Sequence, residues 1–453
     1  MGNVIIMQDK SFYKRMIKIA LPITLQSLLQ ATLVLIDEIM VGQMGSDSIA
    51  GIGLSSKFIS LFTVTVTAVV TVASILIAQY IGNKNKEGVN DSFNFNLYIS
   101  LGITILFMIV SIFIPSSIMG IYSNDSATIE IAAQYLRVAS IGFLPTILTL
   151  MCSAYLRNIG YAKIPMYASI VSVFTDIVLN YCLIFGNFGF PKLGVVGAAL
   201  ATTIARFVEF AIVFIVFEKI RKRSEHTLWL TFKFTKPFMI NVFKILFPIL
   251  MCEFLWSLGE NVYAVIYGRI GTEQCAAMTL TYPVQNLMIG LLSGVASATG
   301  IMIGNLLGAN EEEKAYEESK EFVKVTIIMA VVISLIIVLF SKFYVKIYNV
   351  PDDTMQVTIY ILYAYAVVFI AKVVNMVLGG GVLRSGGKTK YIMLIDIVGT
   401  WIIGVPAGIL TSFIFNLPIY WVYFILSLEE YVRVILEVKL FRSRKWINNV
   451  ADA

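Results

Sequence analysis

Acidic side chains lie inside stretches of this sequence that are otherwise apolar. Asp37 and Glu38 follow the run 17–34, which contains no acidic residue. Asp176 and Asn180 are four residues apart in another apolar run and therefore share one face of a helix. An ionisable side chain at the bilayer centre costs roughly 2.5–3.5 kcal/mol on insertion scales, so such residues indicate function. Oxygen ligands of these types suit a hard monovalent cation, and two carboxylates can equally share one proton.

Thr202 adds a hydroxyl oxygen from the next apolar run. We predict that Asp37, Asp176, Asn180 and Thr202 form a site for a small cation, which would be a metal site if the ion is Na⁺ and a proton site if it is H⁺. A structural interpretation stays open for each acid. Asp37 is compatible with an interfacial acid exposed to water, and Asp176 with a helix-to-helix hydrogen bond to Asn180. Glu38 lies about 100° around the helix from Asp37, and its role is left open.

The apolar runs recur along the whole chain. Of the 453 residues, 58% are hydrophobic and 14% are charged, whereas soluble globular proteins have about 25% charged residues. Stretches of roughly 20 residues, each long enough to cross a bilayer, alternate with polar breaks. We therefore predict an all-α polytopic membrane protein with twelve transmembrane helices in two pseudo-symmetric six-helix lobes. The predicted spans are 17–42, 49–80, 92–121, 129–154, 162–187, 194–219, 241–268, 274–306, 320–345, 355–381, 389–413 and 417–441.

The distribution of Lys and Arg predicts the orientation of these spans. With the first span entering from the cytoplasm, most basic residues fall at cytoplasmic ends and loops. The opposite side holds only Lys192, Arg269, Lys342 and Lys346. We expect an integral protein of a bacterial plasma membrane with both termini in the cytoplasm. The basic run 218–226 is interpreted as an orientation signal in a linker, in preference to a site for nucleic acid or anionic lipid.

Residues for catalysis are scarce. The only histidine is His226, which leaves little room for a histidine-based triad or metal centre. The four cysteines fall within or beside predicted spans without metal-ligand spacing, and we interpret them as packing residues. They are Cys152, Cys182, Cys252 and Cys275. We predict no enzymatic activity and no cofactor beyond the coupling ion.

The second half of the sequence repeats the first. LPITLQSLLQ at 21–30 recurs as FPILMCEFLW at 247–256, and AQYIGNKNKE at 78–87 recurs as GNLLGANEEE at 304–313, both at an offset of 226 residues. Because six spans is an even number, both copies enter the membrane from the same side. Parallel repeats of this kind are typical of transporters whose halves rock about a central site. The predicted domains are an N-terminal lobe, a basic cytoplasmic linker and a C-terminal lobe, at 1–219, 220–240 and 241–453.

Several motifs have a familiar arrangement. Pro22 is followed fifteen residues later by Asp37 and then by VGQMG, while LRNIGYAK (156–163) pairs with LRSGGKTK (383–390), and LGVVGAALAT opens the sixth span. Over nearly the whole chain these motifs resemble the multidrug and toxic compound extrusion (MATE) family of the MOP flippase superfamily. The resemblance implies export of organic cations and drugs in exchange for Na⁺ or H⁺. It also implies that Asp37 is the aspartate whose protonation or Na⁺ ligation drives transport.

Two departures from the family pattern concern the ion sites. Some members carry N-x-x-x-D in the fifth span, where this sequence has the reverse order, from Asp176 to Asn180. Members with an ion site in the second lobe carry an aspartate in the tenth span, where this sequence has Val373 beside Lys372. The sequence therefore favours an ion site in the first lobe.

The second half supplies the residues of a predicted substrate cavity. Glu253 and Glu260 are seven residues apart and share a helix face, and aromatic side chains between and beyond them suit flat cations. The predicted cavity residues are Glu253, Trp256, Glu260, Tyr263, Asn375 and Asp396. Other charged residues at helical spacing are interpreted as structural ion pairs, namely Arg206 with Glu209 and Arg433 with Glu429 and Glu430.

The sequence thus predicts a secondary active antiporter, acting as a monomer, that exports small amphipathic cations by alternating access. Its other expected partners are membrane lipids. The alternative is a flippase for a lipid-linked oligosaccharide or lipid precursor, which a cationic central cavity able to hold pyrophosphate would favour. A channel, as a further class, would conduct ions without exchange. The identity of the substrates, the choice between H⁺ and Na⁺ and the stoichiometry are not encoded in readable motifs.

Overall fold

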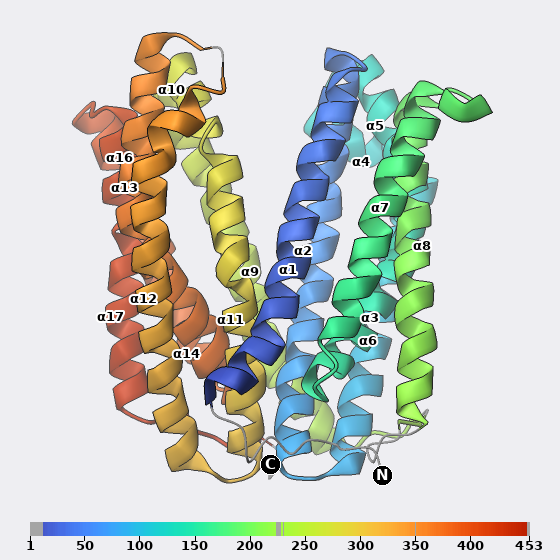
Figure 1. Cartoon of the computed structure of the whole chain (residues 1–453), viewed down its shortest axis with the longest axis vertical. Helices are drawn as coiled ribbons and strands as arrows, with labels where there is room; N and C mark the ends of the chain where they lie inside the picture. Colours follow the sequence, from blue (N-terminus) through green and yellow to red (C-terminus); the bar gives the residue numbers. More distant parts are fainter. Residues whose placement is uncertain (1–11, 223–227, 230, 349, 451–453) are drawn as a thin grey trace. The chain divides into compact units, whose positions relative to one another are not determined.

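The computed structural model describes residues 12–222, 228–229, 231–348 and 350–450. Lys10, His226 and the central part of the basic run lie outside the described residues. Within these ranges, eleven helical stretches are long and apolar enough to cross a membrane (Figure 1). The predicted twelfth span is divided into two helices at Leu428. The prediction of an all-α polytopic membrane protein is confirmed.

The described residues group into two compact units. The first contains Leu21–Lys236, and the second contains Phe12–Ala20 together with Pro237–Ala453. The helix α1 (Phe12–Gly42) contributes to both, since Arg15 near its start forms a buried ion pair with Glu318 of the second unit. The other helices of the first unit are α2 (Ser46–Gly82), α3 (Lys86–Phe113), α4 (Pro115–Tyr122), α5 (Ser126–Ala139), η1 (Ser140–Gly142), α6 (Phe143–Asn158), α7 (Lys163–Phe185), η2 (Asn187–Gly189) and α8 (Gly194–Arg221).

The second unit repeats this arrangement of long helices. Its neighbours in sequence often pack together, as α12 and α13 do, just as α7 and α8 pack together in the first unit (Figure 1). Its helices are α9 (Lys236–Ile270), α10 (Thr272–Thr279), α11 (Tyr282–Gly308), α12 (Glu312–Val345), α13 (Asp352–Val377), η3 (Leu378–Leu383), α14 (Thr389–Asp396), η4 (Ile397–Gly404), α15 (Val405–Ile409), η5 (Leu410–Ile414), α16 (Ile419–Ser427) and α17 (Glu429–Arg442).

Several predicted spans are interrupted, and proline explains three of the interruptions. Pro115 starts α4, and Pro283 lies in the first turn of α11, because a proline lacks the N–H that an interior helical position needs. In the eleventh span, Pro406 lies between the two π-helical segments η4 and η5. Wider π-helical turns accommodate the missing hydrogen bond without ending the span. By contrast, α1 and α9 continue through Pro22 and Pro248, which occupy equivalent repeat positions.

Part of the expected linker is hydrogen-bonded to α3. The side chain of Asn94 donates to the backbone oxygen of Trp229 at 2.9 Å, and the backbone N–H of Trp229 donates to Asn90 Oδ1 at 2.8 Å. The ring of Phe232 stacks on Tyr98, with centroids 5.2 Å apart. Trp229 and Phe232 therefore lie against α3 of the first unit, and α9 begins at Lys236, inside the segment expected to be linker.

Candidate functional site

The four predicted ion-coupling residues meet in the first unit, where α1, α7 and α8 come together. Asn180 Nδ2 donates to Asp37 Oδ1 at 2.8 Å and to Asp176 Oδ1 at 3.4 Å. Thr202 Oγ1 donates to the same Asp176 oxygen at 3.3 Å. Asp176 and Asn180 are buried, each with about 1% exposure, and Asp37 is half-buried. One amide group thus links two carboxylates.

Close packing of α7 against α8 creates this meeting point. A Cβ on Gly197 would lie 2.5 Å from the backbone oxygen of Leu183, so only glycine allows the two helices to approach this closely. The helices run in opposite directions, joined by a turn that begins with Gly186 in the left-handed conformation at φ 77°. Moving back along α7 from Leu183 and forward along α8 from Gly197 brings Asp176 and Thr202 face to face.

Two oxygens in this cluster have no hydrogen-bond donor. Asp176 Oδ2 and Asn180 Oδ1 are buried and unpartnered among the described residues. Buried polar atoms are almost always satisfied, so each exception calls for an explanation. Both atoms are acceptors, and together with the Asp37 carboxylate they form a donor set of oxygens only. Such a set fits H⁺ or Na⁺, which prefer hard oxygen ligands.

No basic side chain neutralises the cluster by direct pairing among the described residues. Arg206 lies one turn along α8 from Thr202, but its Nη1 pairs with Glu209 Oε2 at 3.0 Å, as the spacing predicted. Glu209 in turn accepts from Ser169 Oγ at 2.5 Å. Gln26 donates to Ser169 Oγ at 2.8 Å and accepts from Arg157 at 2.6 Å. A hydrogen-bonded network that includes Arg157 and Arg206 therefore lies beside the acid cluster, and its positive charges are engaged by Gln26 and Glu209.

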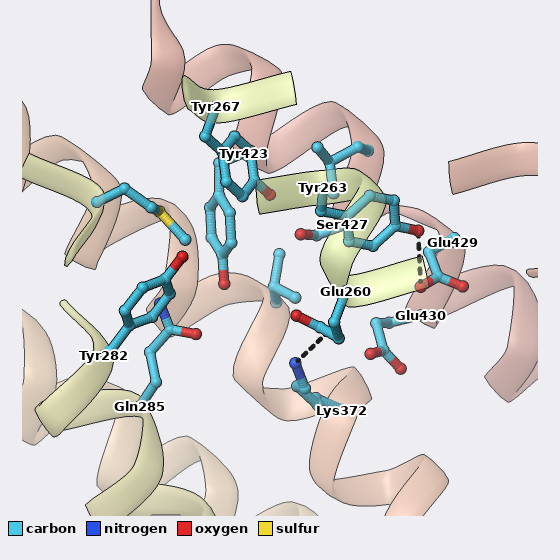
Figure 2. A pocket seen from close by; sticks show the side chains of 13 residues that line it. Glu260, Tyr263, Tyr267, Tyr282, Gln285, Lys372, Tyr423, Ser427, Glu429 and Glu430 are labelled. Carbon is cyan, nitrogen blue, oxygen red and sulfur yellow. Dashed lines mark hydrogen bonds and ion pairs between the residues drawn. The ribbon is translucent and has the colours of Figure 1, made fainter. Parts of the chain in front are cut away.

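The second unit contains a small, partly open cavity of roughly 40 Å³ (Figure 2). Since one water needs about 10–15 Å³ of such space, the cavity has room for a few water molecules, whereas drug-sized ligands need hundreds of Å³. Glu260 of α9 and Lys372 of α13 point toward each other across it, with Oε1 and Nζ 3.9 Å apart. On one side the Tyr263 hydroxyl donates to Glu429 at 3.4 Å. The other lining residues include Tyr267, Tyr282, Gln285, Tyr423, Ser427 and Glu430.

Acids of the second unit are largely paired with bases. Arg433 Nε lies 2.8 Å from Glu429 Oε2, and Arg433 Nη1 lies 3.5 Å from Asp396. Its guanidinium also donates to the Thr400 hydroxyl. Glycine makes room for this side chain, since a Cβ on Gly399 in the π-helical segment η4 would lie 2.5 Å from Arg433 Nε. The predicted pairing of Arg433 with Glu429 is therefore present and extends to a second helix.

The six predicted substrate-cavity residues separate into two groups. Glu260 and Tyr263 line the cavity of Figure 2. The other four do not. Glu253 accepts from Arg384 at 3.0 Å, and Asn375 donates to Glu430 Oε2 at 2.6 Å. Asp396 pairs with Arg433, and Trp256 is 42% exposed.

Two charged residues of the second unit were not predicted from the sequence to belong to a site. Lys372 supplies the positive charge opposite Glu260, and a lone lysine in an apolar run carries no signal of its partner. Glu437 is 2% exposed, and its Oε2 has no hydrogen-bond partner among the described residues. Its spacing, four residues after Arg433, continues the acidic pattern of α17 and is the signal that could have identified it.

The comparison with known proteins agrees with the repeat. The MatE family matches the chain twice, over residues 22–182 and 248–410, so the second match begins 226 residues after the first. The chain is 25% identical over 421 residues to "Uncharacterized transporter YisQ" of Bacillus subtilis, covering 91% of this chain and 90% of that protein. It is 25% identical over 441 residues to "Probable multidrug resistance protein NorM" of Thermotoga maritima, covering 96% and 93%.

Solved structures show the same fold. "Crystal structure of MATE in complex with MaL6" superposes with a TM-score of 0.89 at 20% identity, covering 98% of each chain. A multidrug resistance MATE family transporter of the MOP superfamily in an outward-facing conformation superposes with a TM-score of 0.88 at the same identity and coverage. Since the family matches most of both halves, and relatives and folds agree over nearly the full length, the chain belongs to the MatE family and is a MATE transporter, a secondary transporter and not an enzyme.

Proposed function

We propose that this transporter is a cation-coupled antiporter that exports small amphipathic organic cations, and that the cluster of Asp37, Asp176, Asn180 and Thr202 takes up the coupling ion. The names of the NorM relatives support the class of substrate. The coupling ion is H⁺ or Na⁺. The two units described above act as the lobes of alternating access, joined by the basic linker, and both termini face the cytoplasm of a bacterial cell.

One observation carries this proposal. Asp37 and Asp176 are linked through the single amide of Asn180, have no ion-pair partner among the described residues and leave the buried Asp176 Oδ2 without a donor. Two carboxylates that share a site repel each other, and a proton or Na⁺ between them relieves the repulsion. An arrangement of acids that is incomplete without a cation suits a reversible ion site better than a permanent structural contact.

Coupling follows from differential binding. An ion that binds one lobe arrangement more tightly shifts the equilibrium toward it, and a substrate that prefers the other arrangement shifts it back. Because this coupling is reciprocal, ion uptake weakens substrate binding by the same factor by which substrate weakens ion binding. In the first unit, an ion between Asp37 and Asp176 would tighten the contact of α1 with α7. That change in helix packing is the step that we propose is transmitted to the substrate.

The test is export of a fluorescent cationic dye from proteoliposomes in which a pH gradient and a Na⁺ gradient are imposed separately. Asp37→Asn and Asp176→Asn should each abolish gradient-driven export while the protein elutes as a folded monomer. Glu38→Gln is the matched control, because Glu38 adjoins Asp37, is exposed and loses the same charge. It should keep most of the wild-type rate.

The result also separates the two ions. If the pH gradient alone drives wild-type export, the site binds H⁺; if only the Na⁺ gradient does, it binds Na⁺, and Thr202→Ala should then weaken Na⁺ dependence. Normal uphill export by Asp37→Asn would contradict the proposal. So would an equal loss in Glu38→Gln, since the effect would then follow from charge near the helix end and not from the cluster.

A further inference from the structure

We infer that the second unit carries a binding site for an anionic phospholipid, in a groove between α12 and α17 that no step of transport uses. The groove encloses about 470 Å³ and is open on one side. It is lined by Tyr316, Lys320, Val323, Lys324, Ile327 and Ile328 of α12, by Leu378 of η3, and by Val438, Phe441 and Arg442 of α17. Its volume is in the range of pockets that hold drug-sized molecules.

The groove has one basic end and one apolar end. The ring of Tyr316 stacks on Phe441, with centroids 4.7 Å apart, and closes the end where Lys320 and Arg442 lie. Because the two helices run in opposite directions, Ile328 and Val438 lie toward the other end, about 12 Å farther along α12 from Lys320 at 1.5 Å per residue. Ile328 is 56% exposed, and exposed apolar residues continue beyond it along α12.

The charged side chains that line the groove indicate whether it binds an anion or a cation. Lys320 pairs with Glu317 at 2.6 Å, and Lys324 lies 4.0 Å from Glu321, but both lysines are solvent-exposed, so these pairs hold them weakly. Arg442 has no carboxylate within ion-pair distance among the described residues. Arg442 therefore keeps an uncompensated charge, and the two exposed lysines can turn from their glutamates to an anion, so the groove favours an anionic occupant over an organic cation.

The arrangement of basic and apolar residues in the groove matches the parts of a phospholipid. An anionic phospholipid has a phosphate that suits Arg442 and the flexible lysines, and an acyl chain that suits Val323, Ile327 and Val438. Lysine side chains can lie along apolar surface while their ammonium groups reach the headgroup level. The basic end also lies near Lys439 and Lys445, at the side of the membrane predicted to be cytoplasmic. We therefore assign the groove to a lipid of the bilayer in which the protein resides.

The experiment is native mass spectrometry of the full-length protein with added phosphatidylglycerol or phosphatidylcholine of identical acyl chains. The wild type should retain phosphatidylglycerol in preference. The triple variant Lys320→Gln, Lys324→Gln, Arg442→Gln should lose that preference by at least about tenfold, since each basic residue near the headgroup contributes to the attraction. The matched control is Lys314→Gln, Lys439→Gln, Lys445→Gln, which removes the same charge near the same end without touching the groove lining, and it should retain the preference.

A second variant tests the apolar part of the groove. Val438→Trp fills the groove and keeps all three cations, so it should reduce retention of both lipids, and added inorganic phosphate should not displace bound phosphatidylglycerol from the wild type. Equal losses in the triple variant and its control would overturn the assignment. So would undiminished lipid retention in Val438→Trp, displacement by inorganic phosphate, or a dimer that the triple variant dissociates, because a second copy of the chain would then occupy the groove.

Discussion

The acids of the two units differ in what surrounds them. In the first unit, Asp37 and Asp176 share an amide donor and have no ion-pair partner among the described residues. In the second unit, Glu253 pairs with Arg384 and Glu260 faces Lys372, while Arg433 serves both Asp396 and Glu429. The two repeats therefore share their helices but differ in whether these acids are paired with basic side chains.

This difference indicates a division of tasks. A buried acid that already has a fixed basic partner gains little from binding a cation, whereas removing that partner leaves an uncompensated charge. An acid cluster without a base is stabilised only when a cation arrives. We therefore expect substitutions in the second unit to act mainly on stability and those at the first-unit cluster mainly on coupling.

The largest effect on stability is expected from Arg433→Met. This change leaves the buried Glu429 and the half-buried Asp396 without their shared base, and breaking a buried ion pair destabilises proteins by about 3–5 kcal/mol. Thermal unfolding of the purified protein in detergent, followed by fluorescence-detected size exclusion, should show a clear drop in the midpoint.

The contrasting variant is Asp37→Asn, which removes an acid that has no basic partner. Its midpoint should remain at or above the wild-type value even though its coupled export is lost. A drop as large as that of Arg433→Met would show that Asp37 also has a structural partner and would erase the distinction between the two units.

A smaller effect is expected from Gly197→Ala. The added methyl group would approach the backbone oxygen of Leu183 at 2.5 Å, so α7 and α8 must separate, and such overpacking costs about 1–3 kcal/mol. The separation also moves Thr202 away from Asp176, so export should fall together with stability.

Gly102→Ala provides the matched control. Its Cβ would meet nothing within 4 Å in the middle of α3, so the change should be neutral or stabilising by up to about 1 kcal/mol. If Gly197→Ala behaved like Gly102→Ala in both unfolding and dye export, close packing of α7 and α8 would not be what positions the cluster.

The smallest effect is expected for the pair Glu260 and Lys372. The two charged atoms are 3.9 Å apart, and the Glu260 side chain is 45% exposed, so a double-mutant cycle with Glu260→Gln and Lys372→Met should give a coupling of about 0.2–1 kcal/mol. Unfolding midpoints of the two single variants and the double variant provide the measurement. A coupling of several kcal/mol would place this pair with Arg433 as a buried structural contact.

Much of the fold follows from patterns that the sequence displays directly. The apolar runs predicted the eleven membrane-length helices of the described residues, because a helix can satisfy its own backbone within lipid. The exact ends were less predictable. A hydropathy pattern does not show the break at Leu428, and it does not show that the span around Pro406 continues through π-helical turns.

The residues of the candidate sites could likewise be predicted from the sequence only in part. Asp176 and Asn180 could be placed on one face from their spacing, and Asp37 could be identified because an acid in an apolar run is rare. The substrate cavity formed by the six predicted residues stays a prediction, and two of them, Glu260 and Tyr263, line the small cavity of the second unit. The spacing of residues along the sequence shows which of them share a helix face. It does not show which neighbouring helix that face contacts.

The sequence by itself determined the membrane class, the twofold repeat, the family and the presence of intramembrane acids, because each of these depends on residue type and on spacing along one helix. Only the tertiary structure decided which acids meet bases on other helices. Lys372 and Arg384 are each more than one hundred residues from the acid that they meet, and Gly197 acts only through the backbone of another helix. Electrostatic energy depends on distance in space, and the packing of helices sets that distance.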